Sequence, residues 1–209
     1  MDLENFPQIY PLFLFEANLK GFYRTKGIFS SRHLLENFSD INLSDNFAQI
    51  YMAWDEENLY FKFVVETELI ESSYPDFLRK DVVEIFIHTR ADSLPRYMNK
   101  FSHHFLIFPA KVNGIHAMEI TKFRTEDRHE LCPLQLIEVK SEIEKKKYIL
   151  EVQLSKLCLT GFDPESSQSI RLDFRIHRYQ NDPMFFFFNS QFFSEHNLKM
   201  WPKIELVKE

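Results

Sequence analysis

Strict alternation of apolar and polar side chains is the feature that most constrains this chain. Residues 170–177 read IRLDFRIH, in which every second side chain is apolar. A period of two places one set of side chains on each face of a β-strand, whereas a helix has a period of about 3.6. The apolar set fits a core and the charged set fits solvent or a ligand. This segment therefore predicts a strand with one buried face.

Shorter apolar segments, several with the same alternation, recur along the chain from Gln49 onward. They predict strands at residues 49–54, 59–65, 83–87, 105–109, 117–122, 134–140, 148–154, 170–177, 185–188 and 204–207. Turn signals separate them: the acidic residues 55–58, the pair Asn113-Gly114 and the charged residues 141–147 each predict a connection between neighbouring strands. Short strands at this spacing are typical of an antiparallel sandwich.

We therefore predict an all-β fold: a two-sheet antiparallel β-sandwich, of the jelly-roll or immunoglobulin-like kind, over residues 46–209. For residues 1–45 we predict an irregular segment packed on this sandwich, with one short helix within residues 31–38. A second helical turn is expected at residues 155–159. The 209 residues fit one domain. The 23 Phe and 8 Tyr against only 4 Gly also favour sheet, where large side chains pack across strands.

Charge and cysteine usage exclude several classes of partner. With 31 acidic and 25 basic residues, the chain lacks the basic field that attracts nucleic acid or an anionic membrane. Cys132 and Cys158 are too few for a disulfide framework or a closed zinc site. The first residues are acidic rather than basic, and the apolar stretch at 10–15 is too short to span a membrane. We expect a soluble, cytoplasmic protein.

The sequence contains no linear catalytic motif: no nucleophile elbow, metalloprotease motif, phosphate loop or dinucleotide fingerprint. His103 and His104 are adjacent on a predicted strand, so they point to opposite faces and cannot bind the same ion. We therefore expect ordinary strand histidines, no catalytic residue and no cofactor. We expect residues 55–57 to form a solvated hairpin turn, with oxygen ligation of a structural calcium ion as the alternative. An enzyme whose site is assembled from scattered residues remains a further alternative.

Aromatic rings and carboxylates together suit the recognition of sugars. A flat ring stacks on the C–H face of a sugar, and carboxylates orient the hydroxyl groups by hydrogen bonds. Most of the 33 aromatic residues must nevertheless fill the core. We expect Trp54 and Trp201 to be core residues rather than ligand platforms.

Four segments resemble family 9 carbohydrate-binding modules and the related DOMON-like sandwiches. They read MAWDEENLYF (52–61), KDVVEIFI (80–87), YILEVQL (148–154) and WPKIEL (201–206). They occur in the order found in that family and extend the resemblance over residues 48 to 209. The resemblance implies a sandwich fold.

The resemblance also implies a ligand site. In that family a terminal sugar lies between two tryptophans, with a glutamate and an arginine among its polar partners. By position the platforms correspond to Phe77 or Leu78 and to Phe192 or Phe193, and the glutamate corresponds to Glu84. The arginine position, on the strand that contains Phe105, corresponds to Leu106 or another apolar residue.

The ligand-binding residues that we predict are Phe77, Glu84, Arg175 and Phe193. Phe77 and Phe193 would stack on the ligand, while Glu84 and Arg175 would form polar contacts. A structural ion pair of Glu84 with Arg175 or Arg171 is the alternative.

The predicted function is a non-catalytic domain that recognises a carbohydrate or a similar small polar ligand. The alternative is a protein-interaction or assembly domain without sugar binding, in which the apolar segment at residues 9–15 packs on its own sandwich or on another subunit. The oligomeric state does not follow from the sequence.

Overall fold

The computed structural model describes residues 19–23, 29–36, 38, 44–93, 95, 97–187 and 198–208. Within these ranges, eleven strands make up most of the regular structure and the helices are single 3-10 turns. The strands are β1 (Leu19–Tyr23), β2 (Ala48–Trp54), β3 (Asn58–Val65), β4 (Val82–His88), β5 (Ser102–Val112), β6 (Ile115–Glu119), β7 (Ile137–Ile143), β8 (Tyr148–Ser155), β9 (Ser169–His177), β10 (Met184–Phe185) and β11 (Lys203–Val207). The 3-10 turns are η2 (Ser31–His33), η3 (Leu134–Leu136), η4 (Lys156–Cys158) and η5 (Leu198–Met200).

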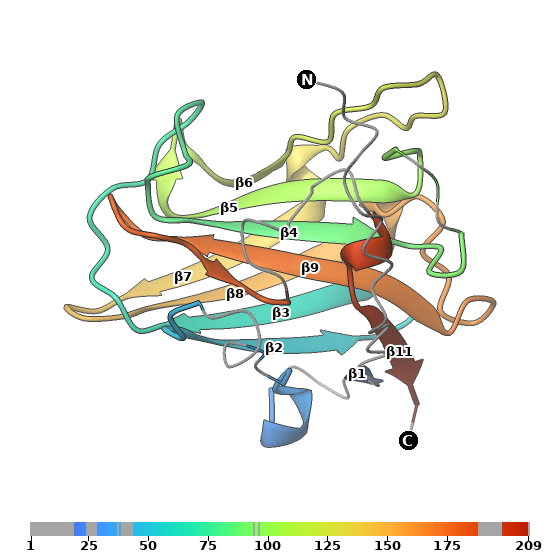
Figure 1. Cartoon of the computed structure of the whole chain (residues 1–209), viewed down its shortest axis with the longest axis horizontal. Helices are drawn as coiled ribbons and strands as arrows, with labels where there is room; N and C mark the ends of the chain where they lie inside the picture. The colour runs from blue at the N-terminus through green and yellow to red at the C-terminus, as the bar shows by residue number, and fades with distance from the viewer. Residues whose placement is uncertain are drawn as a thin grey trace, which may run out of the picture.

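Backbone pairing joins the strands into one continuous sheet. Their order is β6-β5-β4-β9-β11-β1-β2-β3-β8-β7, and β10 pairs with β9 beside this path. Figure 1 shows β4, β5 and β9 running side by side, with β11 and β1 next to the edge of β2. The prediction of an all-β fold is confirmed. The prediction of a wholly antiparallel arrangement is wrong at one strand: β1 pairs in parallel with both of its neighbours, β2 and β11.

The core lies between the two halves of this curved sheet. One half contains β4, β5 and β9, and the other contains β2, β3 and β8. On β3, buried and half-buried side chains alternate along the whole strand, as a period of two requires. Phe61 and Phe63 of β3 meet Phe174 of β9 edge to face, with ring centroids 5.6 and 5.4 Å apart. At the open end of the path, Ser141 of β7 donates a hydrogen bond of 2.7 Å to the Pro109 carbonyl of β5. The two halves therefore face each other across an aromatic core.

The strand β1 lies in the segment for which the sequence predicts irregular structure. Its five residues, LKGFY, are too short to display an alternating pattern. Its place is fixed by contacts with distant residues: the indole N–H of Trp54 donates to the Gly21 carbonyl at 2.7 Å. Trp54 is buried in the core, as predicted. Residues 9–15, the predicted packing segment, lie outside the described residues.

All three predicted turns are present, two of them close to where the sequence places them. Residues 55–57 connect β2 with β3, and Asn113 and Gly114 connect β5 with β6 with φ angles of 50° and 85°. The predicted loop at 141–147 is shorter than expected, because β7 continues to Ile143 and only residues 144–147 connect it with β8. The pairing across all three turns is antiparallel. The predicted helix within residues 31–38 shortens to η2. No helix among the described residues is long and apolar enough to cross a membrane.

Two glycines give a matched test of backbone strain. Gly161 has a φ of 79°, and a Cβ atom there would lie 2.6 Å from Cδ1 of Phe101. Gly114 has a φ of 85°, but a Cβ atom would meet no atom within 4 Å. We expect Gly114→Ala to cost about 1–2 kcal/mol through strain alone and Gly161→Ala to cost more, because Phe101 must also move. Urea unfolding of both variants measures the difference, and equal losses would contradict it.

Candidate functional site

The candidate site lies on the outer face of β4, β5 and β9, on the side opposite the main core. Register places Glu84 of β4 between Leu106 of β5 and Arg175 of β9. Because side chains alternate along each strand, residues two positions away from these partners face the same side. The outer face of these three strands therefore brings together polar side chains from distant parts of the chain.

Glu84 is the centre of this polar cluster. His104 Nε2 lies 2.8 Å from Oε2 of Glu84, and His177 Nε2 lies 2.6 Å from Oε1. Arg175 forms an ion pair with the same carboxylate, with Nε 3.3 Å from Oε1. Burial opposes the charge of Glu84, but the two histidine hydrogen bonds and the Arg175 charge outweigh it and hold the Glu84 pKa well below its ordinary value.

Arg175 is held by aromatic rings as well as by Glu84. Its guanidinium carbon lies 5.7 Å from the ring centroid of Phe86 and 5.8 Å from that of Phe185. These distances permit cation–π attraction. Phe86 also stacks on His104, with ring centroids 4.1 Å apart and an interplanar angle of 24°. The side chains of Arg175 and His104 therefore have little freedom to change orientation.

The loop between β3 and β4 places an aromatic pair beside this cluster. The rings of Tyr74 and Phe77 lie nearly parallel, with centroids 6.5 Å apart and an interplanar angle of 9°. Tyr74 is exposed and Phe77 is half-buried. The Phe77 ring is edge-on to the His177 ring, at a centroid distance of 6.3 Å. The aromatic pair therefore connects the surface with the buried polar cluster.

Asp81 fixes this loop. Its Oδ2 accepts hydrogen bonds of 2.8 Å from the backbone N–H groups of Ile70 and Glu71, and its Oδ1 accepts one of 3.1 Å from Tyr179. The Leu78 carbonyl lies 3.0 Å from His177 Nδ1. The loop that carries Tyr74 and Phe77 is thus attached to the end of β9. Such attachment reduces the cost of ordering a ligand platform on binding.

Three of the four predicted ligand-binding residues meet in this cluster. Glu84 contacts Arg175 directly, and Phe77 reaches Glu84 through His177. The alternative ion pair of Glu84 is present with Arg175; Arg171 instead donates to the carbonyls of Ala91 and Trp201. Phe193, with its neighbour Phe192, lies outside the described residues, so its role stays a prediction. 

Trp201 is buried as expected, but it packs on the outer face with Phe86 rather than in the main core.

Sequence reasoning missed His104, His177, Tyr74 and Asp81. His104 was treated as an ordinary strand histidine, whereas it hydrogen-bonds to Glu84. The alternation alone indicates that both histidines lie on the same face as Glu84. His104 is two positions from Leu106 and His177 is two positions from Arg175, and these are the register partners of Glu84.

The acidic turn proposed for calcium is a hydrogen-bonded hairpin turn. Asp55 Oδ1 accepts from the backbone N–H groups of Glu57 and Asn58 at 2.8 and 2.7 Å. Glu56 accepts a hydrogen bond of 2.7 Å from Tyr23. Glu57 pairs with Lys156. Donors from the protein itself therefore stabilise the turn. Calcium binding at this position stays a prediction.

Comparison with known proteins identifies the family. The sequence model described as "carbohydrate family 9 binding domain-like" matches residues 28–184. The chain belongs to this family. The match includes β2 to β9 and therefore Phe77, Glu84 and Arg175 of the candidate site. A search of the curated proteins finds no match.

Two solved structures of family 9 carbohydrate-binding modules from Caldicellulosiruptor kristjanssonii share the fold. The module in complex with cellotriose is 14% identical and has a TM-score of 0.66, covering 92% of this chain and 94% of that chain. The module in complex with glucose is 16% identical and has a TM-score of 0.58, covering 78% of this chain and 77% of that chain. At these identities the comparison establishes the fold.

Proposed function

We propose that this protein is a non-catalytic carbohydrate-binding domain that holds a sugar against the outer face of β4, β5 and β9. The observation that carries the proposal is the convergence of Phe77, Glu84 and Arg175 in a member of this family. These residues span 98 positions of the sequence, yet they form one continuous set of contacts through His177. Glucose and cellotriose, the ligands of the two similar modules, define the first sugars to test.

In this proposal the aromatic pair supplies the apolar contact. Tyr74 and Phe77 present nearly parallel rings on an anchored loop, which suits the C–H face of a pyranose ring. Phe193 is the proposed second platform. Glu84 and His177 are both buried, so in this proposal they position Arg175, whose side chain is 15% exposed. We further propose that the two halves of the sheet act as the two layers of a β-sandwich, with residues 1–45 packed on it, and that the protein is cytoplasmic.

Sugar binding is tested by calorimetric titration with glucose, cellotriose and a panel of other oligosaccharides. We expect heat of binding with the parent chain and about tenfold weaker binding for Phe77→Ala, a loss of ~1.4 kcal/mol. Tyr51→Ala is the matched control, because Tyr51 is half-buried on β2 in the other half of the sheet. The absence of heat with every sugar, or equal affinities for the parent and Phe77→Ala, would contradict the proposal.

A further inference from the structure

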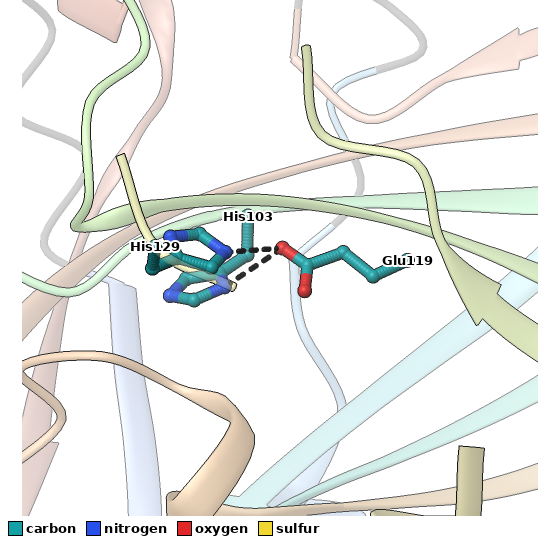
Figure 2. A group of neighbouring side chains, drawn as sticks. All are labelled: His103, Glu119 and His129. Atoms are coloured by element: carbon teal, nitrogen blue, oxygen red, sulfur yellow. Dashed lines mark hydrogen bonds and ion pairs between the residues drawn. The ribbon is translucent and has the colours of Figure 1, made fainter. Parts of the chain in front are cut away.

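A second cluster of polar side chains lies on the opposite face of β5 from the candidate sugar site. It consists of His103 of β5, Glu119 at the end of β6, and His129 of the loop that follows β6. His103 Nδ1 lies 3.0 Å and His129 Nε2 lies 2.8 Å from the same oxygen, Oε1 of Glu119. Figure 2 shows both imidazole rings turned toward that atom. One ligand atom from each residue lies within 4.8 Å of the other two.

The two nitrogens do not form an ordinary hydrogen-bond arrangement with this carboxylate. Thr121 donates its hydroxyl proton to the same Oε1, at 2.5 Å. Three groups therefore share one oxygen that offers two lone pairs. Around Glu84, by contrast, the two histidines use different carboxylate oxygens. Oε1 of Glu84 has two neighbouring groups, His177 Nε2 and Arg175 Nε, whereas Oε1 of Glu119 has three.

The contact of His129 with a carbonyl fixes which of its ring nitrogens carries a hydrogen. Its Nδ1 lies 2.9 Å from the Lys100 carbonyl, which can only accept, so Nδ1 carries a hydrogen. In the neutral ring Nε2 then presents a lone pair to the Glu119 carboxylate. Two lone pairs at 2.8 Å repel each other, so this contact needs either a proton on Nε2, as in the matching contacts of His177 with Leu78 and Glu84, or a cation between the two atoms. A cation shared by both histidines and the carboxylate removes this repulsion.

The donor set and its surroundings match those of a transition-metal site. Two imidazole nitrogens and one carboxylate oxygen are ligands that Zn²⁺ accepts, at roughly 2.0–2.2 Å each. Ligand atoms of a tetrahedral site then lie roughly 3.3 Å apart, so a small outward shift of the present contacts suffices. Metal-binding histidines usually donate their other N–H to a carbonyl, as His129 does to Lys100. The backbone N–H of Cys132 holds Oε2 of Glu119 at 2.6 Å, which orients the carboxylate.

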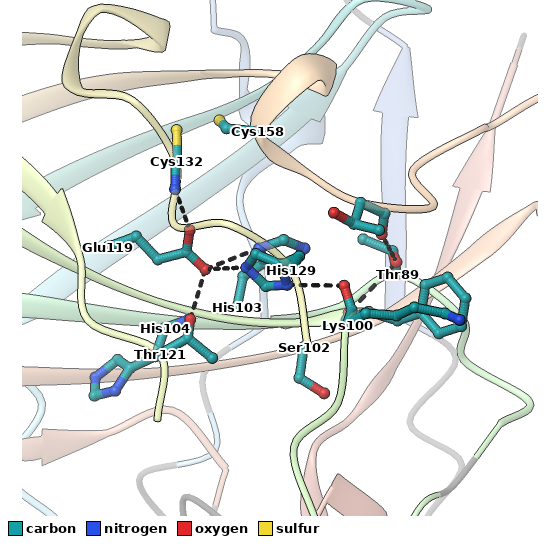
Figure 3. A network of polar contacts seen from close by, with 12 residues as sticks. Thr89, Lys100, Ser102, His103, His104, Glu119, Thr121, His129, Cys132 and Cys158 are labelled. Carbon is teal, nitrogen blue, oxygen red and sulfur yellow. Dashed lines mark hydrogen bonds and ion pairs between the residues drawn. The ribbon is translucent and has the colours of Figure 1, made fainter. Parts of the chain in front are cut away.

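The cluster supplies three protein ligands and leaves a further position for water. Cys132 contributes its backbone N–H, and Figure 3 shows its Sγ directed toward Cys158 and away from the histidines. His103 and Glu119 are buried, whereas residues 122–128 of the loop that carries His129 are largely exposed. The Phe123 ring covers His129 edge to face, with centroids 4.8 Å apart. Movement of this loop would give an ion a path into the site.

We propose that His103, Glu119 and His129 bind one divalent first-row transition metal ion, with Zn²⁺ as the main candidate. Ca²⁺ and Mg²⁺ fit poorly, because both prefer sites built from oxygen ligands. The adjacent histidines face opposite sides, as the sequence predicts: His104 contacts Glu84 and His103 contacts Glu119. The metal site therefore does not depend on sugar binding by the other face.

The test is calorimetric titration of the full chain, first treated with a chelator, with ZnCl₂ and in parallel with CaCl₂ and MgCl₂. We expect one equivalent of Zn²⁺ to bind and to raise the midpoint of thermal unfolding, with no binding of Ca²⁺ or Mg²⁺ that depends on His129. His129→Asn, in the loop, should weaken Zn²⁺ binding at least 100-fold, and Glu119→Gln should do the same. Circular dichroism without metal confirms that each variant is folded.

His116→Asn is the matched control, because His116 lies on β6 and contacts the Phe108 carbonyl at 2.9 Å, outside the cluster. It should bind Zn²⁺ like the parent chain. Failure of Zn²⁺ to bind the parent, or equal Zn²⁺ affinities for the parent and His129→Asn, would overturn the proposal. If Glu119→Gln fails to fold, His129→Asn alone decides.

Discussion

Glu84→Ala is expected to lower the free energy of unfolding by about 3–5 kcal/mol, because it breaks a buried ion pair from one side. The substitution removes the carboxylate that accepts from His104 and His177 and pairs with Arg175. Arg175 then retains its charge in a site where its side chain is only 15% exposed. The loss is measured by urea unfolding at pH 7. The slope of the unfolding free energy against urea concentration is compared between variants.

Glu151→Ala provides the matched control for this prediction. Glu151 pairs with Lys62 at 3.5 Å, but its side chain is 37% exposed. An ion pair at the surface contributes less than about 1 kcal/mol. A loss of that size for Glu84→Ala as well would show that the cluster does not carry the stability assigned to it.

Asp173→Asn is expected to stabilise the protein at neutral pH and to have little effect near pH 4. Asp173 is buried on β9, and burial raises its pKa to about 8 from an ordinary value of 3.8. Its Oδ1 accepts a hydrogen bond of 2.9 Å from the Phe174 N–H, which the asparagine oxygen can also accept. With a pKa of about 8 the folded chain holds Asp173 mostly protonated at pH 7, so the variant keeps the contact and removes the cost of protonating this carboxyl on folding.

The direction of this pH dependence follows from proton binding. The folded state holds the Asp173 proton more tightly than the unfolded chain, so the stability gained from it is complete below pH 3.8 and is lost as pH rises through 8. Each pH unit between these values costs about 1.4 kcal/mol, which gives a difference of about 4 kcal/mol between the parent and Asp173→Asn at pH 7.

Urea unfolding of both chains at intervals from pH 4 to pH 9 measures this difference. Asp127→Asn, at an exposed ion pair with Lys100, serves as the control and should show no comparable pH trend. A constant difference between the parent and Asp173→Asn over this range would contradict the raised pKa.

The sequence was sufficient for much of the strand pattern because burial on one face imposes a period of two. That period placed Glu84 and Arg175 on the outer face, and the structure pairs them in register. It could not show which residues of different strands meet, since register depends on contacts between distant segments. The contacts of His104 and His177 with Glu84 therefore emerged only from the fold.

Two further features depend on contacts that no local pattern records. β1 pairs in parallel with β11, whose residues are about 185 positions away in the sequence. Its position depends on the hydrogen bond from Trp54 to Gly21 rather than on alternation. Likewise, His103 and His129 come from a strand and an irregular loop, so only the fold brings both to Glu119.

The most direct test of the proposed sugar site is a nuclear magnetic resonance titration of the isotopically labelled chain with glucose and then cellotriose. If the sugar lies against the aromatic pair and the Glu84 cluster, the backbone amide signals of Phe77, Leu78 and His177 shift in a saturable manner. The signal of Tyr51 on β2 should stay in place. Saturable shifts confined to residues of β2 and β3, with Phe77 and His177 unchanged, would contradict the location of the site.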